Sequence, residues 1–167
     1  MKKLLGIVLL AAVAVALGLL PFRATDAAKL IPVRTVIVTR DGGEYVIDVG
    51  KAVRGVGRTL SEALSDLQAG APGKIFLPTA EEIVVTDTGE DYDQTVTEVT
   101  ESAAFQPAAG LYRTQARGLD AEKVGDYLAA HPSNMTIVRV RGAVRTGEPA
   151  VLPTLRIVRG GYRVDVP

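Results

Sequence analysis

The fold of this chain is decided in residues 33–49, which read VRTVIVTRDGGEYVIDV. Two runs rich in β-branched residues, 33–39 and 44–49, flank the segment Asp41-Gly42-Gly43. β-branched residues favour strands, and paired glycines between such runs are typical of a tight hairpin turn. We therefore predict a β-hairpin over 33–49. Residues 51–58 either continue the strand pattern or loop out.

A helix start follows this hairpin at Thr59-Leu60-Ser61-Glu62. This is a capping box, in which the threonine hydroxyl accepts a helical N–H and the glutamate reaches back to the N–H of Thr59. Leucine and alanine then recur at helical spacing up to Leu67, and Gly70 and Pro72-Gly73 end the pattern. We predict one helix here, followed by a strand over 83–86.

The last third of the chain carries further strand and helix signals. A strand is predicted at 111–116, and a helix capped by Asp120 is predicted to end at His131-Pro132. The segment Met-Thr-Ile-Val-Arg-Val at 135–140 predicts a strand, because four of its six residues are β-branched. Residues 152–159 and 162–166 predict a closing hairpin across Gly160-Gly161.

Between these parts lies an acidic stretch. Residues 86–109 contain six acidic residues and no basic one. Tyr92, Val96, Val99 and Ala103 recur at helical spacing, which favours a helix over 92–104. A solvated acidic linker over 87–109 is the alternative, because threonine and valine are weak helix formers.

These elements indicate an α+β fold. We predict an N-terminal signal or anchor helix over 1–28, then a strand-rich domain of β-hairpins with two or three short helices. Residues 29–86 form a first α+β subdomain and 87–109 an acidic linker or helix. Residues 110–167 form a second α+β subdomain, or one domain together with 29–86.

The first 28 residues predict export. Lys2 and Lys3 precede the uncharged run Leu4–Phe22, whose 19 residues would span roughly 28 Å as a helix, close to the thickness of a bilayer core. We expect the lysines to stay inside and the rest to be translocated, with the membrane contacted through Leu4–Phe22. The alternative is cleavage after Thr25-Asp26-Ala27, which would release a secreted protein.

The composition of the chain argues against certain anchors, cross-links and partners. The chain has no cysteine, which excludes a lipoprotein anchor and disulfide bonds. From residue 28 onward it has 16 basic and 18 acidic residues and no tryptophan, so no overall charge favours binding of nucleic acid.

No catalytic constellation is predicted. His131, the only histidine, ends a predicted helix, where a cation suits the helix dipole. Ser133 lies two residues away, but the small-x-Ser-x-small turn of a nucleophilic serine does not surround it. We therefore predict that the protein is not an enzyme and has no catalytic residues.

Metal and cofactor sites are not predicted either. The acids Asp87, Glu90, Asp91 and Asp93 could hold a cation, but their spacing is not that of an EF-hand loop, so we expect a solvated face. Gly55-Val56-Gly57 precedes a helix, yet it lacks the further residues of a phosphate-binding loop. We interpret it as a tight connection from strand to helix.

One part of the chain resembles a known family. The residues are Val36-Ile37-Val38, Arg40-Asp41-Gly42-Gly43-Glu44-Tyr45-Val46, Gly55-x-Gly57-x-Thr59-Leu60-x-Glu62-Ala63-Leu64, Gly73–Leu77 and Glu82–Val85. Over about residues 33–86 this pattern resembles the N-terminal domain of the Ger(x)C spore-germination proteins. Those proteins are membrane-associated subunits of germinant receptors. The resemblance implies a similar order of elements and a role at the outer membrane face, with no catalytic residues.

The chain also departs from that family, whose members are lipoproteins more than twice as long. We therefore expect an exported, membrane-associated bacterial envelope protein with a non-catalytic role, binding a protein partner and linked to sporulation or germination. The alternative is a secreted hydrolase or inhibitor. The oligomeric state is left open.

Overall fold

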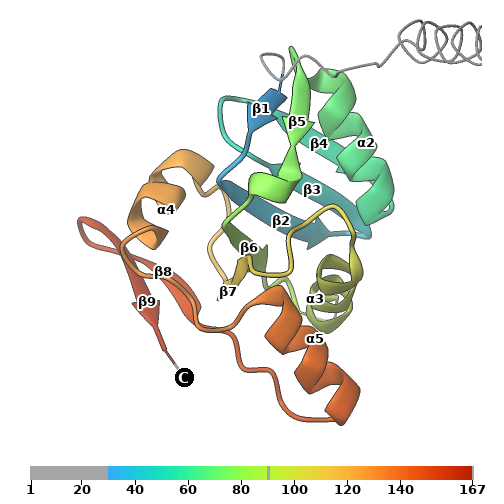
Figure 1. Ribbon diagram of the computed structural model, residues 1–167. Coiled ribbons are helices and arrows are strands. Elements are labelled where there is room, and N and C mark those ends of the chain that lie inside the picture. The colour runs from blue at the N-terminus through green and yellow to red at the C-terminus, as the bar shows by residue number, and fades with distance from the viewer. Residues whose placement is uncertain (1–29, 90, 167) are drawn as a thin grey trace, which may run out of the picture.

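The computed structural model describes residues 30–89 and 91–166, which form an α+β domain (Figure 1). A seven-stranded mixed sheet has the order β4-β3-β2-β6-β7-β8-β9, and β1 pairs with β5 in a separate parallel pair. Strands from residues 29–86 and from residues 110–167 thus share one sheet. Four α-helices are described, where two or three were predicted. The strands are β1 (Leu30–Pro32), β2 (Thr35–Asp41), β3 (Glu44–Asp48), β4 (Arg54–Gly57), β5 (Lys74–Phe76), β6 (Glu82–Thr86), β7 (Gly110–Thr114), β8 (Thr154–Val158) and β9 (Gly161–Asp165).

The predicted N-terminal hairpin is confirmed. Strands β2 and β3 are antiparallel, with Asp41 opposite Glu44 across a two-residue turn. Gly42 and Gly43 both have positive φ, 60° and 83°, which is the conformation that a type I′ turn demands. β4 then adds to β3 as a third antiparallel strand, so residues 54–57 continue the strand pattern.

Helix α2 (Leu60–Gly70) begins where the capping box predicts. The Thr59 hydroxyl accepts the N–H of Glu62 at 3.1 Å. The Glu62 carboxylate accepts the N–H of Arg58 at 2.9 Å rather than that of Thr59, so the box is displaced by one residue. Leu60, Ala63 and Leu67 form the buried face of the helix.

A short 3₁₀ helix, η2 (Leu77–Thr79), leads from β5 into β6. Helix α3 (Tyr92–Glu101) confirms the helical interpretation of the acidic stretch, although it ends three residues early. Helix α4 (Ala121–Leu128) is capped by Asp120, whose carboxylate accepts the N–H groups of Glu122 and Lys123.

The strand predicted over Met135–Val140 is wrong. The chain instead forms helix α5 (Ile137–Thr146), which ends at Gly147 in a left-handed conformation. Ile137 and Val140 lie three residues apart on one helical face, and both are fully buried in the core that includes α3. Packing of these two side chains, with a glycine able to end the helix, outweighs the strand preference of β-branched residues.

The closing hairpin is confirmed, with β8 and β9 antiparallel about Gly160-Gly161. Only a short part of the hairpin joins the sheet, because β8 pairs with β7 only at Thr154 and Leu155. The rest of the hairpin projects beyond the sheet (Figure 1).

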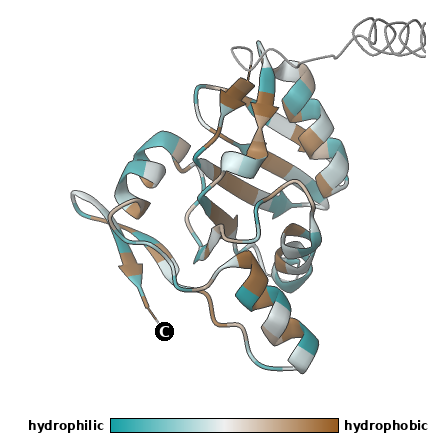
Figure 2. Ribbon diagram, in the orientation of Figure 1, coloured by the Kyte–Doolittle hydropathy of each residue, from teal (hydrophilic) through white to brown (hydrophobic). Residues whose placement is uncertain are grey.

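The sheet is covered on both faces. Alternate residues of the central strands, such as Val36, Ile83 and Leu111, point toward α2, α3 and α5. Their neighbours Val84 and Tyr112 point toward α4. Figure 2 shows the resulting concentration of hydrophobic residues on the strands. Every residue of β6 is buried, as expected for a central strand with both faces covered.

The predicted anchor helix, Leu4–Phe22, lies outside the described residues. Within 30–89 and 91–166, no helix has the length and apolar character needed to cross a membrane.

Candidate functional site

A cleft opens at the amino-terminal ends of the parallel strands, and we call it the amino-edge cleft. It has a volume of about 320 Å³, at the lower end of the range for small-ligand pockets. Its walls come from β1, the start of β2, the β3–β4 turn, β5 and α4. The lining residues are Ile31, Pro32, Val33, Arg34, Thr35, Val49, Gly50, Lys51, Val53, Ile75, Ala121, Glu122, Gly125 and Asp126.

The cleft combines aliphatic walls with charges of both signs. Arg34 and Lys51 supply the positive charges, while Glu122 and Asp126 lie one turn apart on α4. Among the described residues, Lys51, Glu122 and Asp126 have no ion-pair partner. Their charges are therefore available to a ligand.

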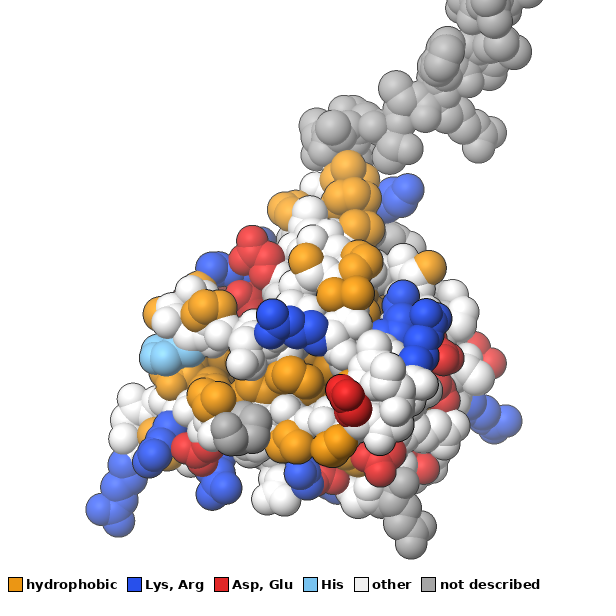
Figure 3. All heavy atoms as spheres, turned by 60° about the horizontal axis from the view of Figure 1, so that its bottom comes forward, with side chains coloured by type: hydrophobic (Ala, Val, Ile, Leu, Met, Phe, Trp, Pro, Cys, Tyr) orange, Lys and Arg blue, Asp and Glu red, His pale blue; other side chains and the backbone are white. Residues whose placement is uncertain are grey.

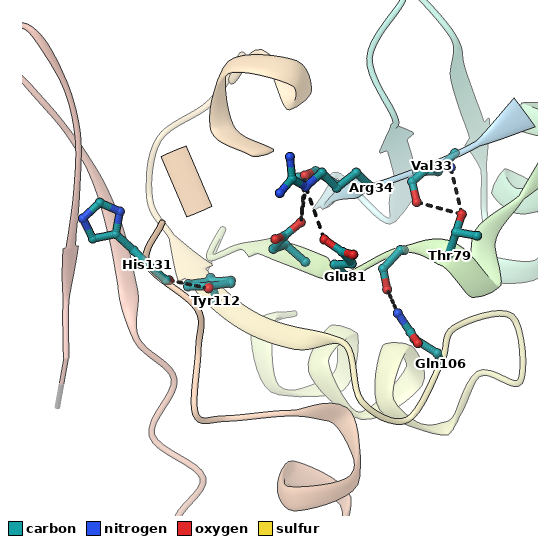
Figure 4. Close-up of polar contacts among 10 residues, drawn as sticks. Val33, Arg34, Thr79, Glu81, Gln106, Tyr112 and His131 are labelled. Carbon is teal, nitrogen blue, oxygen red and sulfur yellow. Dashed lines mark hydrogen bonds and ion pairs between the residues drawn. The ribbon is translucent and has the colours of Figure 1, made fainter. Parts of the chain in front are cut away.

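Arg34 is held by two neighbouring glutamates (Figure 4). Its Nε lies 3.3 Å from Oε2 of Glu81 and 3.9 Å from Oε2 of Glu82. Both pairs engage the same nitrogen. The two terminal nitrogens of the guanidinium are the fork that binds carboxylates and phosphates in a bidentate manner. Arg34 is therefore oriented by the glutamates and still able to contact a bound anion.

Glu82 connects the cleft to the sheet. The residue is only 6% exposed, and its carboxylate accepts a hydrogen bond from the Thr35 hydroxyl at 3.2 Å. Burial raises the pKa of Glu82, while Arg34 and Thr35 act in the opposite direction. The wall residue Thr35 thus has its hydroxyl proton committed to Glu82.

The backbone of the cleft is fixed by local hydrogen bonds. The Thr79 hydroxyl lies 3.0 Å from both the N–H and the carbonyl oxygen of Val33, and it ties η2 to the segment between β1 and β2 (Figure 4). The side-chain amide of Gln106 donates to the carbonyl of Ala80 at 2.7 Å. These contacts hold the wall that carries Arg34.

The β3–β4 turn has an unusual conformation. Lys51 and Ala52 have φ values of 51° and 58°, and the N–H of Val53 donates to the carbonyl of Gly50 at 2.9 Å. This is a type I′ turn built without asparagine or glycine at its central positions. A Cβ on Gly50 would lie 2.9 Å from Cγ of Glu122, so the turn is pressed against α4. Left-handed non-glycine residues often occur at functional sites.

His131 and Ser133, the residues considered for catalysis, are engaged in structural contacts. The His131 ring stacks on Tyr127 at 4.2 Å, and its Nδ1 lies 2.9 Å from the Tyr127 carbonyl oxygen. Its own carbonyl accepts the Tyr112 hydroxyl at 2.8 Å (Figure 4). Ser133 Oγ lies within 3.2 Å of the carbonyl oxygens of Leu111 and Met135. The two side chains hold the loop between α4 and α5.

The acids considered for cation binding lie at the opposite, carboxyl ends of the parallel strands. Asp87 accepts hydrogen bonds from Arg113, and Arg40 Nε lies 3.5 Å from Asp91. Burial favours a higher pKa for Asp87, but the bonds from Arg113 and the N–H of Gly89 hold its pKa below the ordinary value. The described residues contain no group of three or more metal-ligating side chains. Glu90 lies outside the described residues.

Gly55 and Gly57 serve packing, as the interpretation of a tight connection implies. A Cβ on Gly55 would lie 2.2 Å from the Ala63 carbonyl oxygen, and one on Gly57 would lie 2.4 Å from the Ala63 nitrogen. Both glycines allow β4 to lie directly against α2. The space in front of them is filled by the helix and leaves no room for a phosphate.

One backbone N–H on each edge strand of the large sheet is occupied by a side chain. The N–H of Val56 in β4 donates to the Asp66 carboxylate at 2.9 Å, and the N–H of Val164 in β9 donates to the Tyr127 hydroxyl at 3.2 Å. Side chains that occupy edge N–H groups oppose pairing with another strand. Strand addition is therefore opposed at these two positions.

No pattern in the sequence indicates the amino-edge cleft. Arg34, Lys51, Glu122 and Asp126 are separated by up to 92 positions in the chain, and none belongs to a recognisable motif. The one local signal is Asp48-x-Gly50, where the Asp48 carboxylate accepts the N–H of Gly50 at 2.9 Å, as in an Asx turn.

Comparison of the chain with protein-family models, curated proteins and solved structures finds no significant match.

Proposed function

We propose that this chain is an exported, membrane-associated bacterial envelope protein that acts by binding rather than by catalysis, and that the amino-edge cleft is its binding site. The observation that carries the proposal is the composition of the cleft. Aliphatic side chains form its walls, and unpaired charges of both signs lie around it. Apolar pockets with a few convergent polar groups are the usual form of ligand sites.

The chemistry of the lining supports binding rather than catalysis. The described residues that line the cleft include no histidine, cysteine, serine or tyrosine, and the one hydroxyl among them, on Thr35, donates to Glu82. Thr35 is only 4% exposed, so this hydroxyl is not presented to a substrate as a nucleophile would be. The lining suits a ligand with an apolar body and charges of both signs, such as a short peptide.

A peptide probe tests the cleft. Leucyl-leucine, titrated into the full chain and followed by the NMR shifts of cleft residues, should bind more tightly than its acetylated and amidated form. Lys51→Gln combined with Glu122→Gln should weaken binding several-fold. The cleft then loses one cation that could face the carboxylate of the peptide and one anion that could face its amino group. Lys74→Gln is the matched control, since Lys74 is exposed but does not line the cleft. Equal binding of the charged and capped probes would count against the assignment.

The export and membrane parts of the proposal rest on Lys2-Lys3 and the apolar run Leu4–Phe22. A C-terminal tag should remain in the membrane pellet and be digested by protease added to intact protoplasts. A mature protein in the medium that begins at Ala28 would contradict a retained anchor.

The link to germination rests on the resemblance of residues 33–86 to Ger(x)C proteins. Deletion of the gene in a spore-forming host should slow germination without affecting vegetative growth. Normal germination of the deleted strain would contradict this part of the proposal alone.

A further inference from the structure

Exposed aliphatic side chains concentrate in the C-terminal part of the chain, on α5, on the segment that follows it and on the closing hairpin. Eight described residues with large apolar side chains are exposed, and six of them lie in residues 138–166. These are Val138, Val144, Val151, Ile157, Val158 and Val166. Exposed apolar side chains that gather in one part of a protein often belong to an interaction site.

The same segment is strongly basic. Residues 136–166 contain six arginines and two acids, Glu148 and Asp165, whereas residues 30–135 contain nine basic and sixteen acidic residues. The near-zero net charge of the whole chain conceals this asymmetry. The positive charge of the segment comes from arginine alone, with no lysine.

The aliphatic side chains are exposed because their elements extend past the core. Leu155 and Ile157 point to the same side of β8, but α4 covers only Leu155, which is 1% exposed, while Ile157 is 59% exposed. Val144 follows the buried residues Ile137 and Val140 at helical spacing, yet it lies beyond the end of the packed face. The ends of the hairpin and of α5 are thus convex protrusions.

Arginines accompany these protrusions. On the hairpin face away from α4, Arg156 and Arg163 are 67% and 70% exposed, and both lie 2.9 Å from the Asp165 carboxylate. Arg139 and Arg145 are exposed on α5. Figure 3 looks toward this end and shows hydrophobic side chains beside His131, interspersed with basic and some acidic ones. The C-terminal surface consists of the six aliphatic residues together with Arg139, Arg145, Arg156, Arg159 and Arg163.

We propose that the C-terminal surface binds an anionic lipid surface. Its positive charge selects an anionic partner, and its aliphatic side chains suit the boundary between headgroups and acyl chains. Arginine forms paired hydrogen bonds with phosphate. None of the surface residues is aromatic, so it lacks the stacking platform of a single-stranded nucleic-acid site. Its convex shape fits a deformable bilayer better than a complementary protein groove. The proposal does not depend on the amino-edge cleft.

The C-terminal surface lies far from the start of the described chain. β1, where the described chain begins, lies at the opposite end of the domain from α5 and the C-terminus (Figure 1). The surface is therefore presented to lipid away from the β1 end. A vesicle added in trans is the appropriate probe.

The test places the full chain in nanodiscs of neutral phosphatidylcholine and adds larger vesicles for flotation. The chain should float with vesicles that contain phosphatidylglycerol and not with pure phosphatidylcholine, and high salt should weaken binding. Arg156→Gln with Arg163→Gln should lower the partition coefficient about tenfold, because each arginine near an anionic surface contributes several-fold. The matched control is Arg54→Gln with Arg117→Gln. These arginines are similarly exposed, at 59% and 63%, and are also paired with aspartates. Control binding should stay within about twofold of the parent chain.

A second pair of variants separates lipid from other anionic partners. Val138→Ser with Ile157→Ser should weaken flotation several-fold, whereas Val56→Ser should not. Unchanged flotation of the first variant would show attraction to charge without apolar contact and would overturn the proposal. Flotation with neutral vesicles alone, or equal losses in the two arginine pairs, would also overturn it. Self-association without lipid would also overturn the proposal if Arg156→Gln with Arg163→Gln abolished it. The surface would then bind a second copy of the chain.

Discussion

Three glycines determine how closely the helices approach the sheet. Gly55 and Gly57 admit α2 onto β4, and Gly125 admits α4 onto the start of β2, where a Cβ would lie 2.3 Å from Oγ1 of Thr35. In each case the neighbouring atom belongs to the backbone or to a buried side chain. A methyl group at these positions therefore requires the helix itself to shift.

We expect Gly57→Ala to lower the free energy of unfolding by about 1–3 kcal/mol, the usual cost of overpacking. Gly70→Ala is the control. Gly70 ends the same helix with open space around it, and alanine there should stabilise by about 0.5–1 kcal/mol. Urea unfolding of the full chain, followed by circular dichroism, measures both. Equal stability of Gly57→Ala and the parent would contradict the packing argument.

Glu82 makes stability depend on pH. Burial raises its pKa above the ordinary value of 4.5, so the folded state favours the protonated form more than the unfolded state does. The folded chain therefore loses stability as the pH rises through this raised pKa. Glu82→Gln keeps the acceptor for Thr35 but cannot ionise. Unfolding at about pH 4 and about pH 8 should show the variant gaining relative to the parent only at the higher pH. A gain independent of pH would exclude titration of Glu82 as its cause.

At the scale of elements, the β3–β4 turn carries local strain. Lys51 and Ala52 occupy the left-handed region, which costs L-residues roughly 1–2 kcal/mol each. The sequence contains no turn signature here, since Lys-Ala is not a combination that favours a type I′ turn. The neighbouring strands and the contact of Gly50 with Glu122 impose the conformation.

Ala52→Gly should therefore stabilise the chain by about 0.5–1 kcal/mol, because glycine removes the strain and loses part of the gain to unfolded-chain entropy. Ala69→Gly is the matched control. Ala69 is exposed within α2, so glycine there should destabilise by about 1 kcal/mol. Thermal unfolding of the two variants should shift in opposite directions. Shifts of the same sign would contradict the assignment of strain to the turn.

Helix α5 forms although the start of its sequence favours a strand. Residues 135–140 carry the β-branched pattern of a strand. As a helix, the same segment places Ile137 and Val140 together against the core beside α3, while Arg141 donates to the carbonyl of Thr100. The partner segment lies about 40 residues earlier in the chain, so the sequence around 135–140 holds no sign of these contacts.

At the scale of the whole molecule, burial depends on where each element meets its neighbours. Leu155→Ala should cost about 2–5 kcal/mol, as expected for a leucine buried in a core. Ile157→Ala, on the same side of the same strand, should change stability by less than about 0.5 kcal/mol. Their exposed fractions, 1% and 59%, are the basis of the contrast. Denaturant unfolding tests it, and similar losses at the two positions would show that the hairpin end is covered.

Some polar sites of the chain could be predicted from its sequence and others could not. Thr59 and Asp120 were identified as helix caps from sequence, because a cap involves only its nearest neighbours along the chain. The amino-edge cleft was not identified, because Arg34, Lys51 and Glu122 meet only through the order of strands in the sheet. The ion pairs of Asp87 and Asp91 were likewise hidden, since Arg113 and Arg40 arrive from neighbouring strands.

By itself, the sequence determined the α+β class, the two glycine-centred hairpins and the capped helices, while it left the acidic stretch open between a helix and a linker. These features depend on contacts between residues close in the chain, and turn glycines and cap side chains are sufficient to specify them. Only the tertiary structure decided the order of the seven strands, the helical state of 137–146, the amino-edge cleft and the exposed basic end. Those features arise from packing between distant segments, where burial of side chains outweighs local preference.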